Sequence, residues 1–269
     1  MFCKTGDHHQ LYYEWQGNPN STETLVFLNG LTQSTLSWGL MLPYFKDRNN
    51  ILLLDFIFQG QSDKNAEWRD FDRHALDVKT LLDHLGIVRC HMIGLSYGSL
   101  VAQHFAVNSP SYLNKLVLLS TFAHKTPYYD ALELSWWRAL ETGGYQLMLD
   151  IMLPSVLSEA YFNNPLIPIA AMKEMRKEAN QNSEAIFKLM KATRERKDYR
   201  KELEKITTAT LIIQGEKDLL LPVHLAEQVQ QHIPNSELFV VKNAGHTLNL
   251  EHVPEVSQKI NAFLDEVKK

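Results

Sequence analysis

A serine between two glycines constrains the fold of this 269-residue chain more than any other feature. Gly94, Ser96 and Gly98 follow an apolar run, and apolar residues after them recur at helical spacing up to a stop at Pro110. This context predicts a sharp strand-to-helix turn that lifts the serine above the edge of a sheet. Such a turn forces the serine to positive φ. Glycines on either side avoid a Cβ collision with the flanking strand and helix.

Short apolar runs separated by helical patterns continue along the chain. They occupy 10–15, 25–28, 51–54, 86–93, 116–119, 211–213 and 238–241. Most are continuous rather than alternating, which is typical of parallel strands that are covered on both faces. A helical spacing from Phe71 ends at Gly86, and a last helix is expected from about Glu255 to Val267. The sequence therefore predicts an α/β protein with a mostly parallel, doubly wound sheet.

One long interval interrupts this alternation. Between Thr121 and about Thr207 there is no strand-like run, and the composition is helical. We expect Pro154, Pro165 and Pro168 to divide it into several short helices. The predicted organisation is a core domain of residues 1–121 and 208–269 with a helical lid, residues 122–207, inserted in it.

Composition excludes several classes of function. The net charge of -4 argues against nucleic acid as a partner, which requires a basic face. The N-terminus lacks an apolar leader and no run is long enough to span a membrane, so we expect a cytoplasmic protein without a membrane partner. Two cysteines give no disulfide framework, and the histidines have no metal-binding spacing. We expect neither a cofactor nor a metal.

Two residues that could activate Ser96 follow later strands. A serine hydroxyl is a poor nucleophile unless a histidine takes its proton and a carboxylate orients that histidine. Asp218 follows the strand at 211–213, and His246 follows the strand at 238–241. Both lie at the carboxyl side of the predicted sheet, where open α/β sheets place their active sites. Asp218 could instead cap a turn, and Glu216 is then the substitute acid.

The order Ser96, Asp218, His246 is that of the α/β-hydrolases. With the turns at Asn29-Gly30 and Gly245-His246, the chain resembles this superfamily from end to end. Its lid is similar in size to those of enol-lactone hydrolases, carbon-carbon bond hydrolases and pimeloyl-carrier-protein esterases. The resemblance does not single out one of these groups.

The resemblance also implies an oxyanion hole. It assigns the two donors to the backbone N–H groups of Leu31 and Tyr97. Two positions depart from the family pattern: Asn29 stands in place of a histidine, and Phe58 in place of a glycine. The first is expected to alter hydrogen bonds behind the oxyanion loop, and the second to change the shape of the loop that begins at Asp55.

The lid offers two further hypotheses. Its half from Lys173 to Lys205 is basic and could receive an acidic carrier protein or an anionic acyl substrate, with Arg194 and Arg196 as the test positions. We favour a solvated face with ion pairs at helical spacing. Trp136 and Trp137 are expected to pack within the lid, and at most one of two adjacent residues on a helix can face a pocket.

These patterns predict a serine hydrolase of a small-to-medium carboxylic ester, thioester or lactone. The substrate is a small molecule, either free or bound to a carrier protein. One alternative is hydrolysis of a carbon-carbon bond in a vinylogous diketone. Another is a ligand-sensing protein on the same fold, with turnover below about one event per minute. The sequence leaves the oligomeric state open.

Overall fold

The computed structural model describes residues 1–179 and 182–266 and centres on one eight-stranded sheet. The strands are β1 (Phe2–Lys4), β2 (Gln10–Gln16), β3 (Thr24–Leu28), β4 (Asn50–Leu54), β5 (Cys90–Leu95), β6 (Leu113–Leu119), β7 (Thr210–Gly215) and β8 (Ser236–Val241). Their order is β1-β2-β4-β3-β5-β6-β7-β8. The two N-terminal strands pair antiparallel, and every other pairing is parallel. The predicted mostly parallel sheet is confirmed.

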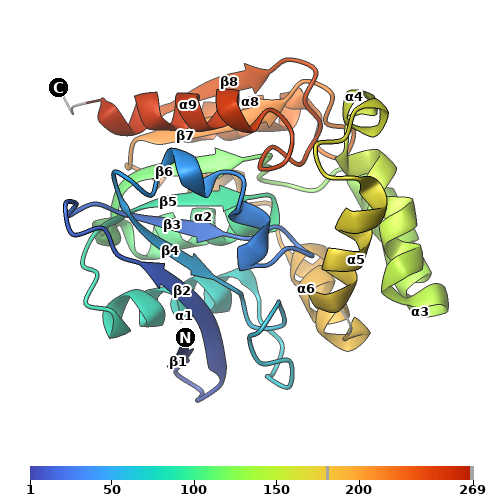
Figure 1. Ribbon diagram of the computed structural model, residues 1–269, viewed down its shortest axis with the longest axis horizontal. Helices are drawn as coiled ribbons and strands as arrows, with labels where there is room; N and C mark the ends of the chain where they lie inside the picture. The colour runs from blue at the N-terminus through green and yellow to red at the C-terminus, as the bar shows by residue number, and fades with distance from the viewer. Residues whose placement is uncertain (180–181, 267–269) are drawn as a thin grey trace.

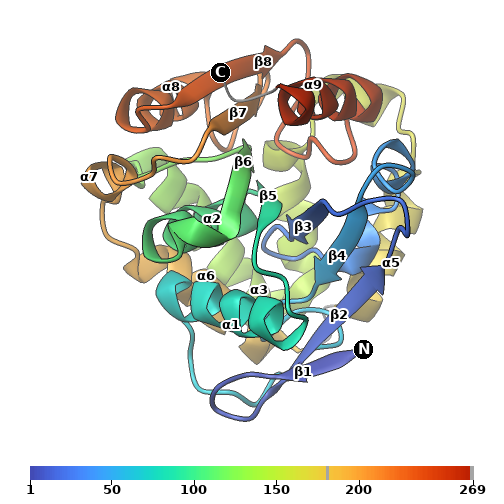
Figure 2. The same cartoon turned by 90° about the vertical axis from the view of Figure 1, so that its left-hand side faces the viewer.

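Helices cover both faces of this sheet. The core helices are α1 (Phe71–His84), α2 (Tyr97–Asn108), α8 (Val223–His232) and α9 (Val253–Asp265). Alternate strand residues point to opposite sides, so Val26 packs in the cluster that includes α1, α2 and α8, whereas Phe27 packs in the cluster that includes α9. Figure 2 shows α1 and α2 on one side of the sheet and α9 on the other. The predicted doubly wound arrangement follows from this two-sided burial.

Among the described residues between β6 and β7 there are five helices. They are α3 (Pro127–Val156), α4 (Glu159–Asn163), α5 (Ile169–Ala179), α6 (Ser183–Glu195) and α7 (Arg200–Leu203). The residues described between these two strands include no strand. Figure 1 shows α3 to α6 gathered beside one end of the sheet. The division into a core at 1–121 and 208–269 and a lid at 122–207 stays a prediction.

The breaks within this helical segment differ in part from expectation. Pro154 does not divide it, because it lies in the last turn of α3, which runs for 30 residues. The irregularity in α3 is at Gly144, whose φ of 69° is accessible to glycine but strained for other residues. Pro165 and Pro168 do lie between α4 and α5, as expected. A proline near a helix end breaks few hydrogen bonds, whereas a glycine at positive φ redirects the axis.

Two element boundaries were also misplaced by the sequence pattern. The strand before Ser96 begins at Cys90 rather than Gly86, and Val88 is exposed. The last helix begins at Val253, two residues earlier than expected, because His252 takes a left-handed conformation before it. Its predicted end at Val267 lies outside the described residues. The sequence pattern also missed β1, which is only three residues long.

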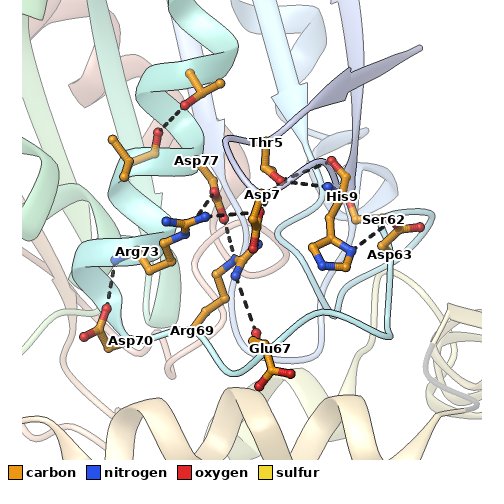
Figure 3. Close-up of polar contacts among 12 residues, drawn as sticks. Thr5, Asp7, His9, Ser62, Asp63, Glu67, Arg69, Asp70, Arg73 and Asp77 are labelled. Carbon is orange, nitrogen blue, oxygen red and sulfur yellow. Dashed lines mark hydrogen bonds and ion pairs between the residues drawn. The ribbon is translucent and has the colours of Figure 1, made fainter.

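A buried ion-pair cluster ties the N-terminal strands to α1. The Arg69 guanidinium lies 2.9 Å from the Asp7 carboxylate and 2.8 Å from that of Asp77, and Arg69 and Asp77 are each 2% exposed. Arg73 also pairs with Asp7, at 3.1 Å. Figure 3 shows these side chains converging between the β1–β2 hairpin and α1. This cluster gives the edge of the sheet a fixed attachment.

None of the helices in the described part of the chain is long and apolar enough to cross a membrane.

Candidate active site

Ser96 occupies a strained turn between β5 and α2. Its φ is 52°, as the sequence predicted. A Cβ on Gly94 would lie 2.5 Å from the Gly98 carbonyl oxygen, and a Cβ on Gly98 would lie 2.2 Å from that of Leu28. Both distances are shorter than any real contact, so a larger residue at either position would push the helix or β3 away. The strain therefore places the serine hydroxyl at the carboxyl end of the sheet.

The structure brings Ser96, Asp218 and His246 together. His246 Nε2 lies 2.8 Å from Ser96 Oγ, and His246 Nδ1 lies 2.7 Å from Asp218 Oδ2. Asp218 and His246 are only 3% and 5% exposed. An ionised carboxylate can only accept hydrogen bonds, so Nδ1 carries the proton and Nε2 is free to accept one from the serine. This arrangement allows proton transfer from Ser96 to His246.

Asp218 is held by donors on both oxygens. Its Oδ1 accepts from the amides of Leu220 and Leu221 at 3.0 and 2.8 Å. Gln214 Nε2 donates to Oδ2 at 2.7 Å and to the Leu221 carbonyl at 2.7 Å. Glu216 is exposed, and its carboxylate accepts from the Asn243 amide instead. The sequence had singled out both acids. Gln214 was missed, because a buried glutamine inside an apolar run gives no signal of its role.

The two residues predicted to supply the oxyanion donors both line one cavity. Leu31 and Tyr97 line it together with Ser96 and His246. Tyr97 is the first residue of α2, where backbone N–H groups have no partner within the helix. Gln59 steadies the other donor: its Nε2 donates to the carbonyls of Gly30 and Leu31 at 2.8 and 3.0 Å. Residues of two segments far apart in the chain thus border one space with Ser96 and His246.

Asn29 lies behind this loop and is fully buried. Its Nδ2 donates to the Leu54 carbonyl at 2.7 Å and to Asp55 Oδ1 at 3.2 Å. Its Oδ1 accepts from Trp38 Nε1 at 2.8 Å. An amide can donate and accept at once, so Asn29 joins the ends of β3 and β4 to the segment of Trp38. The departure from histidine leaves the turn intact and supplies it with hydrogen bonds.

Phe58 takes the backbone conformation that suits a glycine. Its φ is 82°, and the residue is 2% exposed. The ring meets His74 edge to face at 6.4 Å between centroids, and Lys188 Nζ of α6 lies 5.3 Å from the ring centroid. The strained phenylalanine therefore connects the Asp55 loop to the helical segment above the sheet.

Two neighbouring cavities share part of their lining, and Ser96 lines the first of them. The first, of about 50 Å³, has an apolar wall that includes Trp136 and Met152 of α3. The second, of about 260 Å³, lies beside Leu36, Leu40 and Met172. Their common border is polar and is formed by Thr32, Gln33, Arg176 and Thr247. The first cavity has room for little more than a reacting group.

The adjacent tryptophans have different neighbours. Trp136 lines the first cavity, whereas Trp137 packs against Phe187 of α6 at 4.5 Å between centroids. The expectation that both pack within the lid is therefore correct for Trp137 alone. Arg176 was treated in the sequence only as one of many basic residues. Its place at the cavity border depends on how α5 packs, which no sequence pattern reports.

The basic half of the helical segment is mostly an ion-paired face. Lys188 pairs with Glu184, and Lys191 with Glu195, each four residues apart. Arg196 does not belong to this face, contrary to its choice as a surface test position. Its guanidinium donates to Gln103 Oε1 at 2.6 Å and to the Ala123 carbonyl at 3.2 Å. Burial lowers the pKa of Arg196 to about 10, so it stays charged at neutral pH.

The geometry agrees with a comparison to protein families. A family model described as the alpha/beta hydrolase fold matches residues 23–253. The chain belongs to this family, and the resemblance stated from its sequence is confirmed. The sheet order and the strand-to-helix turn at Ser96 are the features that this assignment explains.

Individual relatives place the chain among hydrolases. It is 26% identical to an uncharacterized hydrolase of Bacillus subtilis, over 97% of this chain and 96% of that protein. It is 29% identical to a 2-hydroxy-6-oxononadienedioate/2-hydroxy-6-oxononatrienedioate hydrolase of a Pseudomonas species, over 91% and 89% of the two chains. A crystal structure of an alpha/beta hydrolase from a deep-sea metagenome has a TM-score of 0.91 and 27% identity, covering 100% of this chain and 98% of that one. The chain is a hydrolase.

Proposed function

We propose that this protein is a serine hydrolase of small-to-medium carboxylic esters, thioesters or lactones, in which Ser96, His246 and Asp218 form the catalytic triad. The observation that carries the proposal is the position of His246, which lies 2.7 Å from Asp218 and 2.8 Å from Ser96. A histidine that is hydrogen-bonded to a carboxylate at Nδ1 and to the serine hydroxyl at Nε2 can take the serine proton, while the carboxylate stabilises the resulting imidazolium.

The reaction follows from these positions. Ser96 Oγ attacks the acyl carbon as its proton passes to His246 Nε2. The N–H groups of Leu31 and Tyr97 bind the oxyanion of the tetrahedral intermediate. His246 then gives its proton to the leaving group, and an acyl-enzyme remains. Water, deprotonated by the same histidine, releases the acid and restores Ser96. No step requires a cofactor or a metal.

The cavities support an acyl portion shielded from water. The first cavity admits the reacting carbonyl, and its apolar wall favours an alkyl chain over water. A longer acyl or alcohol portion would pass Arg176 and enter the second cavity.

The first test is hydrolysis of p-nitrophenyl esters from acetate to dodecanoate by the wild type and by Ser96→Ala. We expect wild-type turnover that peaks at one chain length. We expect the loss of nearly all turnover in Ser96→Ala, with the variant folded by circular dichroism. Retention of most activity by Ser96→Ala would exclude the mechanism.

Carbon-carbon bond hydrolysis is the second candidate. The Pseudomonas relative acts, by its name, on a dienedioate, and Arg176 at the cavity border could bind a carboxylate. Here His246 first takes the enol proton of a vinylogous diketone and returns it to carbon, which gives the keto tautomer. A higher turnover rate with a vinylogous diketone than with any ester would favour this reaction. Tight binding of either class with less than about one turnover per minute would favour the ligand-sensing alternative.

A further inference from the structure

The backbone around His246 is bonded to the helical segment rather than to the sheet alone. The Val156 carbonyl, at the end of α3, accepts from the amides of His246 and Thr247 at 3.2 Å each. It also accepts from Thr247 Oγ1 at 3.0 Å. On the core side, Ser120 Oγ donates to the His246 carbonyl at 2.7 Å. The loop that carries His246 is thus hydrogen-bonded to the end of β6 on one side and to the end of α3 on the other.

Glu251 adds a second connection at the same place. It is 4% exposed, and its carboxylate accepts from the amide of Gly245, the residue before His246, at 3.2 Å. The same carboxylate accepts from the Ser158 amide at 3.3 Å and from the Ser158 hydroxyl. Ser158 is the N-cap of α4. One buried carboxylate therefore joins the histidine loop to the start of α4.

The histidine loop and residues 156–158 are so closely packed that no side chain fits between them. A Cβ on Gly245 would lie 2.6 Å from the Ser158 amide nitrogen and 2.7 Å from Glu251 Oε1. The loop and the helical segment are therefore in backbone contact. Any displacement of residues 156–158 strains or breaks hydrogen bonds at Gly245, His246 and Thr247 together.

We propose that Glu251 is a positioning residue that makes the alignment of His246 depend on the position of Val156–Ser158. The inference rests on the proposed role of His246. When residues 156–158 move away, the link through Glu251 from Gly245 to Ser158 is broken. The His246 amide also loses the Val156 carbonyl that accepts its hydrogen bond, so His246 Nε2 shifts away from Ser96 Oγ. A displacement of about 1 Å at a reacting group can reduce the rate on the order of 100-fold. Substrate hydrolysis thus occurs only with this segment in place.

The experiment compares full-length Glu251→Gln and Ser158→Ala with two controls. Glu251→Gln removes the negative charge and leaves one acceptor oxygen, so the hydrogen bonds from Gly245 and Ser158, which both reach Oε2, lose their charge assistance. Ser158→Ala removes one donor together with the α4 cap. Asp77→Asn alters another buried carboxylate, and Asn182→Ala removes the cap of α6, which accepts from the Ala185 amide at 3.0 Å. Neither control residue contacts the histidine loop.

Four quantities are measured on each variant: kcat and KM for p-nitrophenyl acetate, the melting temperature, and the low-field proton resonance of His246 Nδ1–H. We expect kcat of Glu251→Gln to fall about 10–100-fold with KM changed less than about threefold. Its low-field resonance should shift or broaden well below the melting temperature. Ser158→Ala should show the same changes at smaller size. The controls should change the melting temperature alone.

A merely structural role predicts lower stability with an unchanged resonance and kcat, and that result in Glu251→Gln and Ser158→Ala would overturn the proposal. If Glu251→Gln does not fold, the comparison of Ser158→Ala with Asn182→Ala decides. If the wild type hydrolyses no ester, the proposed function fails on its own. The resonance requires no turnover and still tests the positioning of His246.

Discussion

Asn29 illustrates how one buried side chain holds the loop behind the predicted oxyanion site. We expect Asn29→Ala to lower the free energy of unfolding by about 2–4 kcal/mol, because Trp38 Nε1 and the Leu54 carbonyl lose their partner inside the protein. Urea denaturation of both proteins measures the difference. Asn163→Ala, an exposed position in α4, should change the stability by less than about 0.5 kcal/mol. Equal effects at the two positions would contradict this account.

Phe58 combines backbone strain with a buried ring. Glycine would relieve the strain at φ 82°, whereas alanine would keep it, and both would lose the ring contacts. We therefore expect Phe58→Gly to be more stable than Phe58→Ala by about 1 kcal/mol, the reverse of the usual order of these residues in regular structure. Thermal unfolding of the two variants measures it. Greater stability of the alanine variant would show that the strain is unimportant.

At the scale of elements, Arg196 attaches the end of α6 to α2 and to the residues after β6. Its guanidinium donates to Gln103, Phe122 and Ala123, and hydrogen bonds from a charged group are worth about 1.5–3 kcal/mol. We expect Arg196→Met to speed amide hydrogen exchange in α6 by about 10–100-fold.

A lysine at this position should not restore the wild-type exchange, because it lacks the planar array of donors. Arg194→Met is the matched control, since Arg194 is an exposed residue of the same helix that lies over the Trp137 ring. If both methionine variants exchange alike, Arg196 does not anchor the helix.

At the scale of the whole molecule, Glu133 makes stability depend on pH. Burial raises the pKa of Glu133 to about 8. The nearby positive charges of Lys125 and Arg194 lower this pKa, but burial has the larger effect. The folded state then keeps a proton that the unfolded state releases above its ordinary pKa of about 4.5. The stability contributed by Glu133 is therefore greatest below pH 4.5 and is lost as the pH rises to about 8.

Glu133→Gln should remove this part of the pH dependence, which amounts to at most about 1.4 kcal/mol for each pH unit. Urea unfolding between pH 5 and pH 9 compares the slopes of the two proteins. Glu227→Gln, at an exposed position of α8, should keep the wild-type slope. Parallel curves for the wild type and Glu133→Gln would show that the carboxyl group is ionised throughout this range.

Much of the fold was predictable because its signals are local. The run at 51–54 and the spacing after Phe71 report burial of one strand and one helix face, and both elements formed there. The break in α3 was not predictable, because Gly144 and Pro154 look equally disruptive in sequence and only the geometry separates them. Arg196 was misplaced for the same reason: charge predicts exposure unless a polar pocket receives it.

The sequence by itself determined the mostly parallel α/β sheet and the strained serine turn, because glycine spacing and apolar runs act within one element at a time. The order of Ser96, Asp218 and His246 carried the resemblance to the α/β-hydrolases. It also singled out Asp218 and His246 for a site that stays a proposal. Only the tertiary structure decided what surrounds them: Gln214 on the acid, Arg176 at the cavity border, and Glu251 between the histidine loop and α4. Arg176 and Glu251 meet segments far apart in the chain, and long-range packing leaves no periodic trace in sequence. Gln214 lies only four residues from Asp218, but a glutamine inside an apolar run gives no signal of its role.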